Sequence, residues 1–158
     1  MFDKTVDLLN NFIKNNNICN VGLAHGLSGY AYAYIMVYKV THKDKYLLKA
    51  KELLLFEDQL YKSNKTQKAS WCKGETGLCI SRIKYLELSP NIKIRDSFEH
   101  YYKILCTKGI NDVENMCLCH GLYGNIEIIR EINKILKNQN IINEQLILPK
   151  LPVLKKIE

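Results

Sequence analysis

The sequence lacks any long hydrophobic run and any secretion signal. No window approaches the roughly 18 consecutive apolar residues that a membrane-spanning helix needs. The segment from Met1 to Lys4 has neither the basic flank nor the apolar stretch of a signal peptide. Six cysteines in 158 residues are also too few for a secreted disulfide scaffold. The sequence therefore predicts a cytoplasmic protein without a membrane span, whose reduced cysteines bind metal or pack in the core.

Blocks of like charge are absent as well. The formal net charge is +7, but the lysines stand singly along helix-like stretches. Segments that bind nucleic acid concentrate basic residues in one patch, so no nucleic acid partner is expected. A chain of 158 residues is long enough for one domain with its own core and too short to argue for two.

Strand patterns are missing, and helical spacing of apolar residues takes their place. No run of four to eight residues alternates in the way of a strand bounded by hairpin turns. Three amphipathic helices are predicted, one that ends at 15–17, one over 43–61 and one over 94–109. The last of these should end near Gly109, because glycine commonly terminates helices. The predicted fold class is all-α.

A motif with two glycines occurs three times. Residues 24–29, 72–77 and 119–124 read AHGLSG, CKGETG and CHGLYG, and they share the frame x-[HK]-G-x-x-G at offsets of 48 and 47 residues. Each copy introduces an apolar inner helix, which is expected to begin near the fourth residue of the motif. A repeat of this period indicates stacked helical hairpins, each with an outer helix, a loop and an inner helix. Side chains just before the first glycines should therefore meet at one end.

Cysteine and histidine stand at equivalent places of these turns. Zinc binds Cys sulfur and His nitrogen, and a catalytic site supplies three protein ligands and leaves a fourth position open. Cys72, Cys119 and His120 meet that number. Cys117 and Cys119 form an alternative ligand pair, although the repeat favours Cys119, which aligns with Cys72. Core packing, common for free cysteine, is the default for the other four: Cys19, Cys79, Cys106 and Cys117.

The three turns resemble, in order and spacing, those of the lanthionine synthetase C-like cyclases. The likeness is strongest to the C-terminal cyclase domain of class II lanthipeptide synthetases, through residues 22–29, 70–77 and 118–125. This resemblance implies an α/α toroid of seven inner and seven outer helices, with zinc at the mouth of the inner ring. Since about three of the seven hairpins are present, residues 1–140 are expected to form a partial cyclase domain and residues 141–158 a tail.

The resemblance also implies a reaction and roles for individual residues. The family adds a peptide cysteine thiolate to dehydroalanine or dehydrobutyrine, which forms lanthionine or methyllanthionine. The zinc ligands carry over to Cys72, Cys119 and His120, and the acid/base histidine to His25. Lys73 replaces an aromatic residue or histidine of many relatives and is expected to stabilise the developing enolate as a cation. The expected partners are a dehydrated precursor peptide and the remaining part of a split synthetase, which would complement the activity.

The residue types support this chemistry independently of the resemblance. Zinc deprotonates a thiol that is ordinarily protonated at cytosolic pH, and an imidazole is suited to protonate the α-carbon of an enolate. Two alternative functions belong to other functional classes. A non-catalytic zinc-binding helical-repeat module would bind a peptide or a partner protein. A glycoside hydrolase would need a pair of carboxylates at the inner-helix ends, where the sequence supplies only Glu75.

Overall fold

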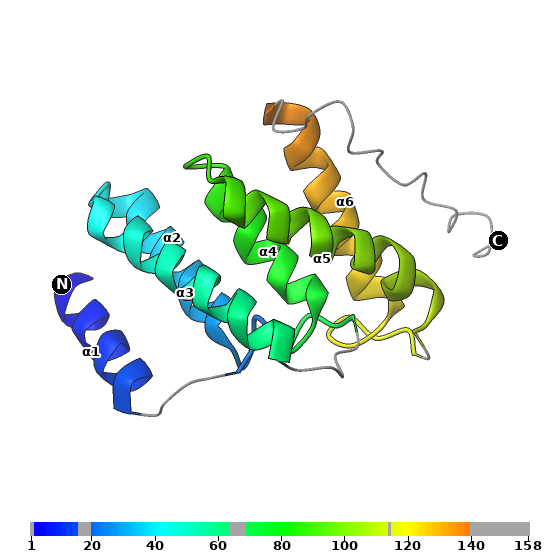
Figure 1. The fold of residues 1–158 in the computed structure, drawn as a ribbon, viewed down its shortest axis with the longest axis horizontal. Helices are drawn as coiled ribbons and strands as arrows, with labels where there is room; N and C mark the ends of the chain where they lie inside the picture. The colour runs from blue at the N-terminus through cyan, green and yellow to red at the C-terminus, as the bar shows by residue number, and fades with distance from the viewer. Residues whose placement is uncertain (1, 16–19, 64–68, 114, 140–158) are drawn as a thin grey trace.

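The computed structural model (Figure 1) describes residues 2–15, 20–63, 69–113 and 115–139. Within these ranges the chain forms six helices and no strand, which confirms the predicted all-α class. The helices are α1 (Phe2–Asn15), α2 (Leu27–Thr41), α3 (Asp44–Ser63), α4 (Glu75–Leu86), α5 (Ile92–Asn111) and α6 (Leu122–Gln139). The expected tail over 141–158 lies outside the described residues.

The helices form two layers. In one layer, α2, α4 and α6 follow one another, and each contacts the next. The second layer consists of α3, which packs on α2, and α5, which packs on α4. α1 lies beside α2, where the ring centroids of Phe12 and Tyr30 are 6.4 Å apart. The predicted alternation of inner and outer helices is therefore present, as a partial helical repeat.

One contiguous apolar core fills the space between the layers. The inner helices contribute Ile35, Leu78 and Ile129, and the outer helices contribute Leu54 and Leu105; all five are fully buried. Each such side chain typically contributes roughly 1.5–3 kcal/mol through burial. This core holds the inner helices side by side, so their first residues lie at one end of the layer. None of the helices in the described part of the chain combines the length and apolar character that a membrane crossing requires.

Gly109 does not end its helix as predicted. α5 continues to Asn111, and Gly109 is buried inside it. A Cβ at this position would lie 2.8 Å from Cδ1 of Leu105 and 3.2 Å from Cβ of Ala69. The Gly109 carbonyl also accepts a hydrogen bond from the side-chain amide of Asn125, at 2.8 Å. Gly109 is therefore a close-packing residue, since its missing side chain lets three segments approach one another.

A buried charged network joins the first motif turn to the helices behind it. Glu57 of α3 accepts hydrogen bonds from the backbone N–H groups of Gly22, at 2.9 Å, and Ser28, at 2.8 Å. Arg82 of α4 forms ion pairs with Glu57, at 3.1 Å, and Asp58, at 2.6 Å. Glu57 and Arg82 are fully buried, so each charge needs its partners to offset the loss of hydration. The network fixes the start of α2 against α3 and α4.

Candidate metal centre

The three motif copies have the same geometry in space. The inner helices begin at the fourth residue of each copy, as predicted: Leu27, Glu75 and Leu122. A Cβ on Gly124 would lie only 1.7 Å from the carbonyl oxygen of Leu118, six residues earlier. The corresponding distances are 2.1 Å at Gly29 and 2.2 Å at Gly77. The second glycine of each motif is therefore required, because any side chain would push away the loop that precedes the helix.

Backbone hydrogen bonds join the three turns in order. The N–H of Ala24 donates to the carbonyl of Cys72 at 3.2 Å, and the N–H of Trp71 donates to the carbonyl of Cys119 at 3.1 Å. His25 follows Ala24 directly and is exposed. The turns that carry the predicted acid/base and the predicted ligands are thus neighbours at one end of the inner layer.

The third turn gathers three potential metal ligands. One ligand atom from each of Cys117, Cys119 and His120 lies within 4.8 Å of the other two. Nδ1 of His120 is 3.0 Å from Sγ of Cys119, and the backbone N–H of His120 donates to Sγ of Cys117 at 3.4 Å. Cys117 and His120 are exposed, and Cys119 is half-buried. Two thiols and an imidazole are donors that zinc binds in proteins.

Cys72 lies in the neighbouring turn, and its side chain is buried. Among the described residues it is not part of the group that lies within 4.8 Å. Desolvation raises the pKa of the Cys119 thiol, and the hydrogen bond to Cys117 and the charges of Cys117 and Cys72 raise it further. The two neighbouring cysteines are therefore close enough to disfavour ionisation of the Cys119 thiol. A bound cation would reverse this effect, because it favours every thiolate at once.

The remaining predicted residues occupy different environments. Lys73 is exposed and follows Cys72 in the second turn. Cys79 is fully buried and Cys106 is half-buried against the core, which agrees with core packing. Cys117 is exposed instead, because it stands in the loop before α6 and not on an inner helix face. Cys19 lies outside the described residues.

Large apolar side chains next to the cluster in sequence are exposed. Trp71, which precedes Cys72, is 42% exposed, and Met116 and Leu118, which flank Cys117, are 56% and 70% exposed. Tyr123, which precedes Gly124, is 46% exposed. Exposed apolar side chains that gather at one place mark surfaces that bind partners or ligands. The end of the molecule that carries the thiols can therefore contact an apolar part of a peptide.

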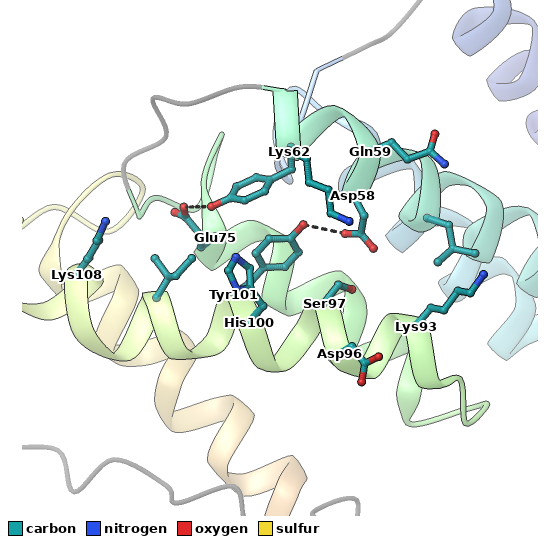
Figure 2. A pocket seen from close by; sticks show the side chains of 13 residues that line it. Asp58, Gln59, Lys62, Glu75, Lys93, Asp96, Ser97, His100, Tyr101 and Lys108 are labelled. Carbon is teal, nitrogen blue, oxygen red and sulfur yellow. Dashed lines mark hydrogen bonds between the residues drawn. The ribbon is translucent and has the colours of Figure 1, made fainter.

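A separate groove of about 850 Å³ lies between α3 and α5 (Figure 2). Glu75, at one end, accepts a hydrogen bond from the Tyr61 hydroxyl at 2.6 Å, and its second oxygen is buried without a partner among the described residues. Asp58 lies farther along the groove. It binds Arg82 at 2.6 Å and the Tyr101 hydroxyl at 2.9 Å. Asp58 and Asp96, the other carboxylates that line the groove, belong to the outer helices α3 and α5. The groove therefore does not supply the pair of carboxylates at the inner-helix ends that a glycoside hydrolase would need.

Comparisons with known proteins point to one family. Residues 6–148 match the family model described as lanthionine synthetase C-like protein. The chain is 32% identical over 136 residues to the lacticin 481/lactococcin biosynthesis protein LcnDR2 of Lactococcus lactis subsp. lactis. This alignment covers 75% of the chain and 15% of the relative, so the chain spans a small part of that protein's length. No solved structure matches the chain significantly.

Proposed function

Because the chain belongs to the lanthionine synthetase C-like protein family, we propose that it is a zinc-dependent cyclase part of a lanthipeptide synthetase. Its substrate is a dehydrated precursor peptide, in which a cysteine is joined to dehydroalanine or dehydrobutyrine. The name of its relative, a lacticin biosynthesis protein, supports this substrate class. The observation that carries the proposal is the hydrogen-bonded junction of the three turns, which gathers cysteine and histidine donors at one exposed end.

The donor set of these turns fits a zinc ion. Zinc would be held by Cys72, Cys119 and His120, two of them adjacent in one tight turn and the third in the turn bonded to it. Desolvation and the neighbouring Cys117 and Cys72 raise the pKa of the Cys119 thiol, and a cation offsets this effect. When bound, zinc supplies the positive charge that keeps a thiol deprotonated near neutral pH.

The chain's own residues are proposed to handle the proton and the developing charge. As the peptide sulfur bonds to the β-carbon, the electron pair of the carbon–carbon double bond moves into an enolate. The α-carbon then takes a proton from His25, whose turn is bonded to that of Cys72 and which is exposed. Lys73, exposed beside Cys72, provides a cation for the enolate oxygen. Trp71 and Leu118 offer apolar contact to the peptide.

Counting thiols in a dehydrated peptide tests this function. Cyclisation does not change the mass of the peptide, but each ring consumes one free thiol, so alkylation followed by mass spectrometry counts the rings. The zinc-loaded protein should lower the thiol count, and His25→Asn should slow this by about 10²–10⁴-fold, the usual contribution of general acid–base catalysis. His42→Asn is the matched control, because His42 is exposed and its left-handed backbone, with φ of 54°, suits asparagine.

The same assay distinguishes the cyclase from the alternative function, a non-catalytic module that binds a peptide. A peptide that binds the protein but keeps all its thiols would favour a non-catalytic peptide-binding module. An unchanged rate for His25→Asn would remove His25 from the mechanism. A peptide that neither binds nor cyclises would contradict both functions.

A further inference from the structure

We propose that Cys117 is a fourth protein ligand of the zinc, and that it occupies the open position until a peptide cysteine replaces it. The proposal rests on the proposed function, since it assumes the site formed by Cys72, Cys119 and His120. It adds Cys117 to that site as a ligand that blocks the open position. Access to the metal would then depend on ligand exchange.

The three donors of the third turn need little movement to surround one ion. Its sulfur lies within 4.8 Å of the ligand atoms of both Cys119 and His120. With Zn–S near 2.3 Å and Zn–N near 2.0 Å, donor atoms of a tetrahedral site stand roughly 3.5–4 Å apart. The difference is about 1 Å, which side-chain rotation can supply.

The loop that carries Cys117 is closed by its own hydrogen bonds. The Cys117 N–H donates to Oδ1 of Asn115 at 3.2 Å, and the Asn115 carbonyl accepts from the N–H of Leu122 at 3.0 Å. A Cβ on Gly121 would lie 2.2 Å from Oδ1 of Asn115, so the loop folds tightly over this glycine. The N–H of His120 points at the Cys117 sulfur, and a hydrogen bond of this kind stabilises a metal-bound thiolate. Cys117 is therefore held beside the other donors.

The second turn shows that a thiol is not needed for the fold of the loop. Ser70 stands 47 residues before Cys117, at the same offset that separates the second and third motif copies. Its Oγ accepts the N–H of Lys73 at 3.4 Å, just as the sulfur of Cys117 accepts that of His120. Ser70 is buried, whereas Cys117 is exposed among other donors. A structural role alone would be met by a hydroxyl, so the exposed thiol points to ligation.

The proposed exchange balances in protons and charge. Three thiolates and a neutral imidazole give a zinc site a formal charge of −1. If a peptide thiol replaced Cys117, its proton would pass to the Cys117 thiolate, and the site would keep the same charge. No oxidant or reductant takes part. Cys117 would thus exclude water and adventitious anions from the metal and yield to a thiol.

Cobalt substitution of the full chain tests the proposal, because the thiolate-to-cobalt absorption of a tetrahedral site grows with the number of thiolate ligands. Cys117→Ser should keep one cobalt ion, and its absorption should fall to about two thirds of the wild-type value, since one of three thiolates is lost. Adding a cysteine-containing peptide should restore it. Serine keeps the hydrogen bond of the loop, as Ser70 shows. Cys106→Ser, outside the turns, should change nothing.

The outcomes separate the two proposals. Unchanged absorption in Cys117→Ser would overturn the ligand role of Cys117 and leave the site of the proposed function standing. A loss in Cys117→Ser with no loss in Cys72→Ser would make Cys117 the third ligand, and the fourth-ligand proposal would be wrong. If the wild-type chain bound no cobalt or zinc, the proposed function itself would fail.

Discussion

Gly124→Ala is a small change that should displace the loop of the proposed metal centre. The added Cβ would lie 1.7 Å from the carbonyl oxygen of Leu118 and 2.7 Å from its carbonyl carbon. Both atoms belong to the backbone, so no side-chain rotation relieves the clash. Leu118 stands between Cys117 and Cys119, and its displacement moves both thiols.

The substitution has two opposite effects on the stability of the protein. Gly124 is the third residue of α6, and helix propensity alone predicts that alanine stabilises the helix by up to about 1 kcal/mol. The clash requires the loop to retreat by about 1.3 Å before the contact reaches 3.0 Å, and overpacking of this kind costs about 1–3 kcal/mol. We expect the clash to prevail. Metal binding should suffer more than stability, because ligand distances tolerate only about 0.2 Å.

Urea denaturation and zinc titration of the same variant measure both effects. Gly124→Ala should lose about 1–2 kcal/mol in the free energy of unfolding and at least tenfold in zinc affinity. Glu131→Ala, on the exposed face of the same helix, should change neither. A Gly124→Ala protein that is more stable than the wild type and binds zinc equally well would refute the steric explanation of the repeat.

Three further changes test the fold around the site. Glu57→Ala should lower the free energy of unfolding by about 3–5 kcal/mol, because it removes one of the two carboxylates that compensate the buried Arg82 and the acceptor of the Gly22 and Ser28 N–H groups. In the same urea experiment the exposed control Glu52→Ala should stay within about 0.5 kcal/mol, and equal effects would show that burial does not matter here. Asn125→Ala should lower the melting temperature, because the Asn125 amide donates hydrogen bonds to two buried backbone carbonyls. Each carbonyl that the substitution leaves unpaired costs about 1–3 kcal/mol, and an unchanged melting temperature would contradict these contacts. Burial raises the pKa of Tyr34 to about 12, above its ordinary value near 10. The stability that its neutral hydroxyl contributes is therefore complete below about pH 10 and is lost as the pH rises toward about 12. Unfolding free energies measured across that range should fall more steeply for the wild type than for Tyr34→Phe, and parallel profiles would contradict the shift.

The starts of the inner helices could be predicted from the sequence because the motif determines them locally. Glycine before the helix and glycine in its first turn leave one way for the backbone to fold, so Leu27, Glu75 and Leu122 follow. Gly109 is also a glycine, but its position in the structure has a different physical reason. Its place inside α5 depends on Asn125, which approaches from another helix. A contact between two helices cannot be predicted from the residues next to Gly109 in the sequence.

The buried network was not predicted, although the sequence holds a partial signal. Glu57 follows Leu53 and Leu54 at helical spacing, so a charge stands on the apolar face of α3. Its partner Arg82 lies 25 residues away, and nothing in either helix alone pairs them. The exposed position of Cys117 was missed for a similar reason, because only the folded loop brings it to His120.

The central claim is that the second and third turns together hold one zinc ion, and metal analysis tests it most directly. The chain is purified, dialysed against weak chelator and analysed for zinc, beside Cys119→Ser and the control Cys106→Ser. Wild type and Cys106→Ser should each retain about one zinc per chain. Cys119→Ser should retain less, and the double variant of Cys119→Ser with Cys72→Ser should retain almost none, because only Cys117 and His120 of the proposed ligands remain. A wild-type chain without zinc, or a double variant that keeps a full equivalent, would contradict the account.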